Sequence, residues 1–280
     1  MALFRQITIV GLGLIGGSLG MAIRRRRLAQ VVVGLSRTSS TLRRAKARGA
    51  IDVGTRDARR AVRDADLVLL ATPVDAIVPY ARRLVRWMKP GSVLSDVGSS
   101  KGRIVRALER ALPRHVAFVG AHPLAGSERR GIEAARADLF GGSVCIVTTT
   151  RRTPRRALRA VTRLWKPLVG RVIVMDPARH DHLLAAVSHA PHLVAFCLVK
   201  ATDRKALTLA PRSFLDATRV AKSDPALWDD IFLSNRSALL SAMGAFDRHW
   251  RALRTTISRG DRVALLRFLA GAQSKRHALD

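Results

Sequence analysis

The 280-residue sequence predicts a doubly wound, mostly parallel α/β sheet followed by an all-helical domain. Three observations support this fold class. Over residues 1–176, short continuous apolar segments alternate with longer segments rich in Arg and Ala, a pattern typical of parallel strands covered by helices on both faces. A Gly-rich turn follows the first apolar segment. Residues 177–280 show long helical patterns without a convincing strand, so we expect one domain over 1–176 and another over 177–280.

Seven strands are expected in the first domain, each rich in Val, Ile and Leu and bounded by polar or Gly-containing segments. They are residues 7–10, 31–36, 67–72, 92–97, 117–121, 143–149 and 171–175. The helical patterns of the second domain are interrupted at 209–213 and 223–225. Because no low-complexity linker separates the two domains, we expect them to pack tightly together.

The composition indicates a globular protein, since 48% of the residues are hydrophobic. Two apolar stretches imitate membrane or export signals. Residues 7–23 are followed by an Arg cluster, whereas a signal peptide has its positive charges first. Residues 183–199 carry two His and a Pro, which favours a buried helix over a membrane span. We therefore expect a soluble, cytoplasmic protein that does not bind a membrane.

Two cysteines, Cys145 and Cys197, lie in apolar runs, and we expect both to be buried free thiols in a reducing compartment. The net charge of +30 would attract phosphates and nucleic acid. However, the Arg residues are spread along the whole chain, and neither zinc-ligand spacing nor an aromatic RNA-binding signature accompanies them. An Arg-rich solvated surface without a specific nucleic-acid site is the expected consequence.

A nucleotide-binding turn is predicted at the start of the first helix. Gly11, Gly13 and Gly16 form G-x-G-x-x-G directly after a strand, with Leu14 and Ile15 inside the motif. In such Rossmann-like folds the first Gly permits the tight turn, and the second lets the backbone approach a pyrophosphate. The third lets helix and strand pack closely, while the helix N-terminus supplies amide groups. The motif's place between a strand and a helix favours a dinucleotide site over a ligand-free turn.

The residues after the second strand indicate which dinucleotide binds. An acid is expected about 20 residues after the motif to hold the ribose of NAD, but Ser36 stands there, followed by Arg37, Thr38 and Ser39. Hydroxyls and a guanidinium suit the 2′-phosphate of NADP, and Arg43 and Arg44 add positive charge nearby. The competing interpretation is that Arg37 is one more surface Arg. We favour NADP over NAD and also assign Thr72, at the end of the third predicted strand, to the cofactor site.

Two polar loops follow the next predicted strands, "SDVGSSKG" at 95–102 and "GAHPLAGSERRG" at 120–131. Ligands of parallel sheets bind beyond the carboxyl ends of the strands, so we expect Ser99 and His122 near the nicotinamide. A His is a suitable base for a hydroxyl proton during hydride transfer.

The helical half offers polar residues for an acidic substrate. His189 and His192 lie three positions apart, and "FLDATRVAKSDPALW" brings together Asp216, Arg219 and Trp228. Arg219 is suited to a bidentate contact with a carboxylate, with Asp216 orienting it. A metal site at His189 and His192, or at His180 and His182, lacks carboxylate or Cys partners at ligand spacing. The residues alone therefore predict an NADP-dependent oxidoreductase of a small acid, without a metal.

Taken together, these segments resemble the prephenate/arogenate dehydrogenase family of tyrosine biosynthesis. The resemblance runs in order through "VGLGLIGGS", "DVGSSKG", "GAHPLAGSERRGIEAA", "LFGG", "SHAPHLVAF" and "TRVAKSDPALWDDIFLSNR". It implies a Rossmann-like domain followed by a helical domain that forms a homodimer. It also implies an oxidative decarboxylation, with prephenate or arogenate as the small-molecule substrate.

By this resemblance His122 takes the substrate's hydroxyl proton, Ser99 holds the hydroxyl in register, and Arg219 pairs with a substrate carboxylate. His192 and Glu128 resemble pocket-lining positions, Trp228 is either a pocket wall or a core residue, and Lys101 matches a family position without an assigned role. Glu128 together with His192 resembles the prephenate-using members, whereas the 34–41 stretch resembles NADP-dependent members, many of which prefer arogenate. We expect prephenate, with arogenate or dual use as the alternative.

Three rival functions remain open at this stage. A β-hydroxyacid dehydrogenase would share the architecture, but its catalytic Lys motif is not apparent here. A basic nucleic-acid-binding protein on a Rossmann scaffold would bind DNA or RNA in a salt-sensitive manner without turnover. A catalytically inactive sensor of NADP is hard to reconcile with the presence of Ser99, His122 and Arg219 together.

Overall fold

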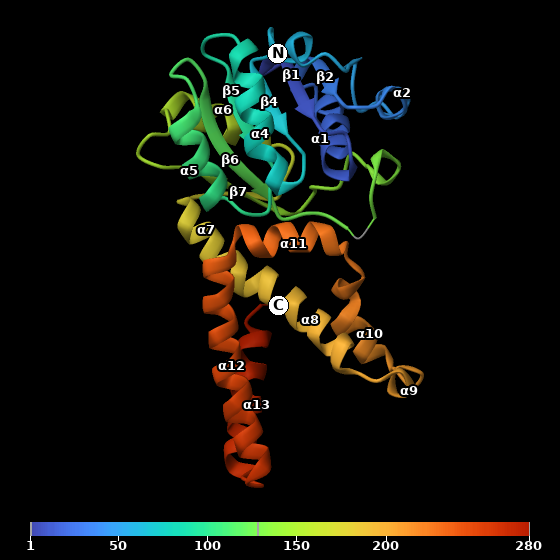
Figure 1. Ribbon diagram of the computed structural model, residues 1–280, viewed down its shortest axis with the longest axis vertical. Coiled ribbons are helices and arrows are strands. Elements are labelled where there is room, and N and C mark those ends of the chain that lie inside the picture. Colours follow the sequence, from blue (N-terminus) through green and yellow to red (C-terminus); the bar gives the residue numbers. More distant parts are fainter. Residues whose placement is uncertain (1, 128, 280) are drawn as a thin grey trace.

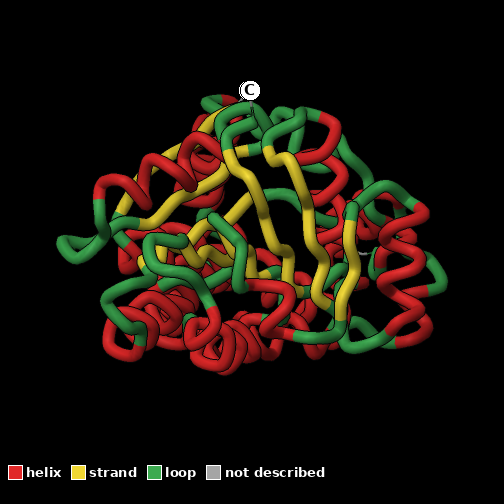
Figure 2. The backbone as a smooth tube through the Cα atoms, turned by 90° about the horizontal axis from the view of Figure 1, so that it is seen from above, coloured by secondary structure: helices red, strands yellow, loops and turns green. Residues whose placement is uncertain are grey.

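The computed structural model describes residues 2–127 and 129–279 and contains an eight-stranded sheet in the order β3-β2-β1-β4-β5-β6-β7-β8. Figure 2 shows the sheet with helices on both of its sides. The strands are β1 (Phe4–Val10), β2 (Ala29–Leu35), β3 (Val53–Thr55), β4 (Leu67–Leu70), β5 (Val93–Asp96), β6 (Ala117–Pro123), β7 (Val144–Thr148) and β8 (Arg171–Met175). The predicted fold class, a doubly wound and mostly parallel sheet followed by helices, is confirmed.

The sequence prediction missed the edge strand β3, which pairs in parallel with β2 through Val53, Gly54 and Thr55. Three residues, one of them Gly, form no apolar run, so no strand pattern was visible. Only the β6–β7 pair is antiparallel among the described strands. The order reverses between β1 and β4, and this topological switch point is where parallel sheets bind nucleotides.

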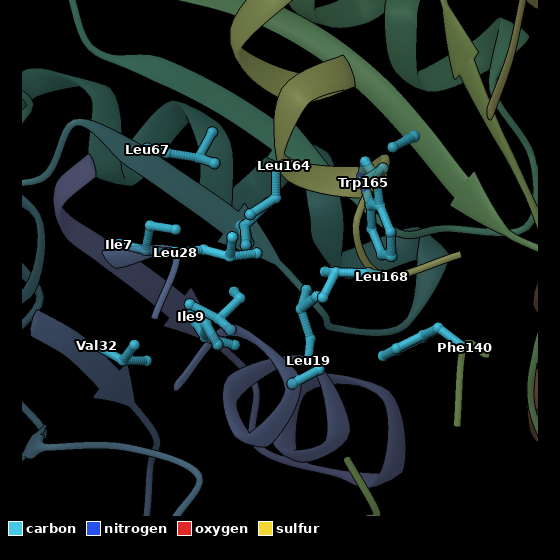
Figure 3. Close-up of a cluster of buried hydrophobic side chains, with 14 of the residues drawn as sticks. Ile7, Ile9, Leu19, Leu28, Val32, Leu67, Phe140, Leu164, Trp165 and Leu168 are labelled. Atoms are coloured by element: carbon cyan, nitrogen blue, oxygen red, sulfur yellow. The ribbon is translucent and has the colours of Figure 1, made fainter. Parts of the chain in front are cut away.

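Two hydrophobic cores lie on opposite faces of the sheet because strand side chains alternate. Ile7 and Ile9 of β1 belong to one core, and Val10 belongs to the other. The first core includes residues of α1, α2 and α6, among them Leu19, and Figure 3 shows part of it, around Trp165. The second core includes residues of α3, α4 and α5. These helices are α1 (Leu14–Arg25), α2 (Ser39–Ala47), α3 (Ala58–Val62), α4 (Val74–Leu84), α5 (Gly102–Ala111) and α6 (Arg155–Trp165).

The chain is helical after β8, without a strand in the described residues from 176 onward. The helices are α7 (Pro177–Leu184), a π-helical turn (Ala185–His189), α8 (Ala190–Ala201), α9 (Arg204–Leu207), α10 (Arg212–Thr218), α11 (Pro225–Ser234), α12 (Arg236–Ser258) and α13 (Arg262–His277). Figure 1 shows α12 and α13 as a long pair extending away from the sheet, with α8 and α10 diverging from them. The domain boundary between residues 176 and 177 stays a prediction.

Much of the helical half is exposed in the single chain. The segment Pro177–Ala201 has the length and composition of a membrane span, and 22% of its most apolar window is buried. The expected buried helix at 183–199 is thus only partly covered, and Cys197 on α8 is exposed, whereas Cys145 in β7 is buried. The prediction that both thiols are buried is therefore wrong for Cys197, since α8 lacks packing partners on one side within the single chain.

Candidate active site

The Gly-rich turn joins β1 to α1, and its three glycines meet different surroundings. Gly11 has φ +90°, and a Cβ there would lie 2.5 Å from the backbone oxygen of Ala71. A Cβ on Gly16 would lie 1.9 Å from the oxygen of Gly11, whereas a Cβ on Gly13 would meet nothing within 4 Å. The first and third glycines therefore permit close packing, and the second leaves open space in front of the helix N-terminus, which suits a pyrophosphate.

A cavity of about 600 Å³ opens at this turn, beside the switch point of the sheet. Five of the predicted cofactor residues line it, namely Gly11, Gly13, Ser36, Arg37 and Thr72. The other five, Leu14, Ile15, Gly16, Thr38 and Ser39, are chain neighbours of these residues and are not in the cavity wall. The Thr72 hydroxyl is buried without a hydrogen-bond partner in the described part of the chain. An open Gly turn and an unpaired hydroxyl fit a bound dinucleotide.

The end of β2 carries hydroxyls and cations where many dinucleotide sites have an acid. Thr38 is the N-cap of α2, and its hydroxyl accepts the backbone N–H of Thr41 at 3.4 Å. Arg37 lines the cavity, together with Arg44 of α2 and Arg56, which follows β3. The side of the cavity formed by β2, α2 and β3 is therefore positively charged.

His122, near the end of β6, begins a chain of three buried side chains. Its Nδ1 lies 2.9 Å from Nε2 of His180, and Nδ1 of His180 lies 2.8 Å from Oδ1 of Asp181. Asp181 also accepts the backbone N–H groups of Lys101 and Gly102, both at 2.8 Å. The chain joins the carboxyl end of the sheet to α7.

The pKa values of this chain favour a carboxylate and two neutral imidazoles. Burial opposes ionisation of Asp181, but the hydrogen bonds from His180 and from the two backbone N–H groups outweigh it and lower the pKa. Burial lowers the pKa of His122 well below its ordinary 6.5, any protonation of His180 would lower it further, and the positive charge of Lys101 acts in the same direction. Burial also lowers the pKa of His180, although Asp181 opposes this shift.

These hydrogen bonds determine the tautomer of His122. A carboxylate only accepts hydrogen bonds, so Nδ1 of His180 carries a proton and its Nε2 is an acceptor. Nδ1 of His122 must then donate to that acceptor, which leaves Nε2 of His122 unprotonated. Among the described residues no side chain contacts this nitrogen by a hydrogen bond. His122 is therefore prepared to accept a proton through Nε2.

A buried ion pair lies beneath this chain. Nζ of Lys101 contacts Oδ2 of Asp96, and both side chains are fully buried. Burial raises the pKa of Asp96, and the positive charge of Lys101 opposes that rise. Lys101 thus connects the end of β5 to Asp181, whose carboxylate accepts its backbone N–H. This position explains why a Lys lies in the "DVGSSKG" loop.

His189 and Asn235 extend the polar cluster into the helical half. The Asn235 amide donates to the backbone oxygen of Asp181 at 2.8 Å and lies 3.2 Å from Nδ1 of His189. Burial lowers the pKa of His189 to about 4. With Nδ1 accepting from Asn235, the proton of the neutral ring is on Nε2, which is buried and unpaired within the described residues. His189 therefore offers a free donor beside the catalytic candidate.

The remaining predicted site residues occupy the surrounding helices and loops. His192 is half-buried and stacks on Trp228 of α11, with ring centroids 3.6 Å apart, and Trp228 is itself buried. Arg219 is close enough to lower the pKa of His192, after the larger effect of burial. Ser99, in the loop after β5, is half-buried and forms no hydrogen bond within the described residues.

Two expectations receive no structural support. Asp216 lies in α10 and Arg219 directly after it, both are exposed, and they form no ion pair in the part of the chain that the structure describes. The expected role of Asp216 in orienting Arg219 is therefore not seen. Glu128 lies outside the described residues.

No group of three or more His, Cys, Asp or Glu residues at metal-binding distance occurs in the described chain.

The sequence interpretation missed the place of His180, Asp181 and Asn235 in this polar cluster. It considered His180 only as a metal ligand paired with His182. The adjacent His180 and Asp181, directly after the last strand, were the available signal. Asn235 gave no signal, because its contacts depend on the packing of α12 against α7.

Comparisons with known proteins agree with this arrangement. Residues 19–174 match the family model for the nucleotide-binding domain of prephenate dehydrogenase, and residues 176–271 match the model for its dimerization domain. A cyclohexadienyl dehydrogenase of Zymomonas mobilis is 39% identical over all of this chain and 97% of its own length.

Solved structures show the same architecture. A prephenate dehydrogenase of Aquifex aeolicus, in complex with hydroxyphenyl propionate and NAD+, has a TM-score of 0.91 at 33% identity and covers 99% of this chain and 98% of its own. An arogenate dehydrogenase of Synechocystis has a TM-score of 0.86 at 30% identity and covers 98% of this chain and 100% of its own. With both domain models matched and relatives similar over their whole length, the chain belongs to the prephenate dehydrogenase family of nicotinamide-dependent oxidoreductases.

Proposed function

We propose that the protein is a prephenate dehydrogenase, which converts prephenate to 4-hydroxyphenylpyruvate with hydride transfer to NADP in tyrosine biosynthesis. The observation that carries this proposal is the His122–His180–Asp181 chain, because it leaves Nε2 of His122 unprotonated at the carboxyl end of the sheet. Family membership supports the reaction type. Arogenate, or both substrates, is the alternative, because the similar proteins include an arogenate and a cyclohexadienyl dehydrogenase.

In this mechanism Nε2 of His122 accepts the proton of the substrate's ring hydroxyl. The bound nicotinamide supplies the hydride acceptor. Loss of the ring carboxylate as carbon dioxide restores aromaticity, so the oxidation is coupled to a downhill step. Asp181 keeps the proton of His180 on Nδ1 and thereby stabilises the positive charge that develops on His122. Ser99 would hold the hydroxyl beside His122.

Residues of the helical half would bind the substrate's carboxylates. Arg219 would pair with one carboxylate, as its exposure and its closeness to His192 permit. His192 and Trp228 form one stacked wall of the site, and the unpaired Nε2–H of His189 is a further donor. Glu128 and Asp216 stay candidates without a structural argument.

NADP is the proposed cofactor because Ser36 and Arg37 line the cavity where an acid would select NAD. Two carboxylates in the described cavity wall, Asp75 of α4 and Glu133, come from other segments of the chain. Gly11, Gly13 and the N-terminus of α1 would hold the pyrophosphate.

We further propose a cytoplasmic homodimer formed by the helical half. Large apolar side chains on α12 and α13 are exposed in the single chain, for example Trp250 at 57%, Ile257 at 60% and Val263 at 67%. Exposed apolar surface of this kind marks an interface in a water-soluble protein, and the matched family domain is a dimerization domain.

Initial rates with prephenate or arogenate, each with NADP or NAD, test the proposed function. We expect reduced cofactor to form fastest with prephenate and NADP. A higher kcat/KM with arogenate would change the substrate, and activity with NAD alone would refute the NADP assignment. Absence of turnover with all four combinations would refute the proposed function.

A further inference from the structure

The cofactor cavity contains a carboxylate that comes from a distant segment of the chain. Glu133 lies in a short 3₁₀ helix, η2 (Ile132–Ala134), and its Oε1 is 2.7 Å from Nη1 of Arg44 in α2. Both residues line the cavity together with Ser36 and Arg37. The end of β2 carries no acid, but an acid from beyond β6 thus reaches the same cavity and pairs with α2.

The backbone holds Glu133 in this position. Gly131 has φ +80°, and a Cβ there would lie 2.7 Å from Oε2 of Glu133, so the carboxylate lies over a residue that must lack a side chain. Arg48, the C-cap of α2, donates to the backbone oxygen of Ala135 at 2.9 Å, which ties the same segment to the end of α2. The N–H of Arg136 donates to the Ser18 hydroxyl, also at 2.9 Å.

We propose that the Arg44–Glu133 ion pair is a specificity-determining element for the 2′ position of the cofactor. A 2′-phosphate would bring negative charge towards Glu133 and compete with it for Arg44, whereas the ribose hydroxyls of NAD would not. Glu133 therefore disfavours NADP relative to NAD, and Arg44, once released from Glu133, binds the 2′-phosphate. This inference rests on the proposed function only in placing the adenosine ribose beside Ser36 and Arg37.

The expected effect is modest because the pair is exposed to solvent. The side chains of Arg44 and Glu133 are 56% and 55% exposed, so water and salt screen their charges. Exposed ion pairs of this kind change an equilibrium by up to about fivefold. The effect should therefore be measurable at low ionic strength and should decrease as salt is added.

Direct binding to the purified protein without substrate tests the proposal. Calorimetric titrations use NADP+, NAD+ and the two fragments adenosine 2′,5′-bisphosphate and AMP. We expect Glu133→Gln to tighten NADP+ and adenosine 2′,5′-bisphosphate about threefold to fivefold and to leave NAD+ and AMP within about twofold. Arg44→Ala should weaken the two 2′-phosphorylated ligands selectively. Asp138→Asn is the matched control, since Asp138 is an exposed acid of the same segment that does not line the cavity.

The outcomes separate this inference from the NADP assignment. If the wild type prefers NAD+, the NADP assignment fails, yet Glu133→Gln must still shift the ratio of the two dissociation constants towards NADP+. If Glu133→Gln changes both cofactors equally, or as little as Asp138→Asn does, the inference is overturned whichever cofactor the wild type prefers. Arg44→Ala provides an independent test should Glu133→Gln fold poorly, and an unchanged ratio in that variant would also overturn the inference.

Discussion

At the scale of single residues, the protonation of His122 depends on groups that are far away in the sequence. His180 is 58 residues from His122. Because Asp181 accepts the Nδ1–H of His180, the Nε2 of His180 accepts the hydrogen bond from His122. Lys101 contributes twice, because its ammonium opposes protonation of His122 and its backbone N–H holds Asp181. The base is thus defined by buried neighbours from α7 and from the N-cap of α5.

The lowered pKa of His122 predicts an activity that persists in mild acid. A solvent-exposed His loses its base form below pH 6.5, whereas His122 stays neutral to a lower pH, so the acid limb of kcat/KM should lie below 6.5. Values of kcat/KM measured across pH test the expected acid limb.

His122→Asn should lower kcat by about 100-fold or more while cofactor affinity changes less than about twofold. The kcat of the variant together with cofactor titrations tests the role of His122. A wild-type kcat in the variant would contradict the assignment of the base.

The Lys101–Asp96 pair predicts a stability effect. Lys101→Met leaves Asp96 buried without its cation, so we expect the free energy of unfolding to fall by about 3–5 kcal/mol. The double variant Lys101→Met/Asp96→Asn removes the uncompensated charge and should recover part of this loss. Urea denaturation of the three proteins measures the difference. A double variant that is less stable than Lys101→Met would show that the charge is not the cause.

At the scale of elements, the close approach of α1 to its neighbouring segments shapes the nucleotide site. Gly20 of α1 lies so near the backbone of Ala50 that a Cβ would come within 2.1 Å of its oxygen, and a Cβ on Gly17 would lie 2.4 Å from Ile132. Small residues along this face therefore let α1 pack closely against η2 and also against the loop that follows α2. The N-terminus of α1 is positioned by these contacts.

Substitution of Gly20 and Gly271, two glycines within helices, by Ala should change the free energy of unfolding in opposite directions. Gly20→Ala forces α1 away from Ala50, and we expect it to cost about 1–3 kcal/mol in the free energy of unfolding. Gly271→Ala in α13 meets nothing within 4 Å, so it should gain about 0.5–1 kcal/mol from helix propensity. Urea denaturation at one protein concentration compares them. Equal effects of the two substitutions would refute the close-approach argument.

At the scale of the whole molecule, the two halves meet at the carboxyl end of the sheet. The His122 chain, the Asn235 contacts and the packing of α11 against α4 all lie at this junction. The far part of the helical half, in contrast, exposes apolar side chains along α12 and α13, the long pair in Figure 1. One part of the helical half therefore packs against the candidate site, while the other leaves apolar side chains exposed.

The exposed apolar side chains predict a dimer that one charge can weaken. Trp250→Asp places a carboxylate on the exposed face of α12, and burying it in an interface would be unfavourable. We expect the wild type to be dimeric and the variant to dissociate at micromolar concentration. Sedimentation equilibrium measures both masses. Val53→Asp is the control, because Val53 is 41% exposed on the edge strand of the sheet, and dissociation of this variant as well would refute the proposed location of the interface.

The sequence by itself determined the features that depend on neighbouring residues. Continuous apolar runs predicted seven of the eight strands, and the Gly spacing predicted the turn between β1 and α1. The loops after β5 and β6 indicated Ser99 and His122, since a strand's carboxyl end is recognised from its own residues. The three-residue strand β3 escaped because its pairing with β2, not its composition, makes it a strand.

Only the tertiary structure decided which side chains meet. Glu133 pairs with Arg44 across 89 residues, and His180 with His122 across 58. Such contacts depend on where η2 packs against α2 and where α7 docks on the sheet, and one sequence contains no local pattern for either. The same holds for the tautomer of His122: its residue type was visible in the sequence, but its free nitrogen follows from the adjacent His180 and Asp181, which the docking of α7 brings to it.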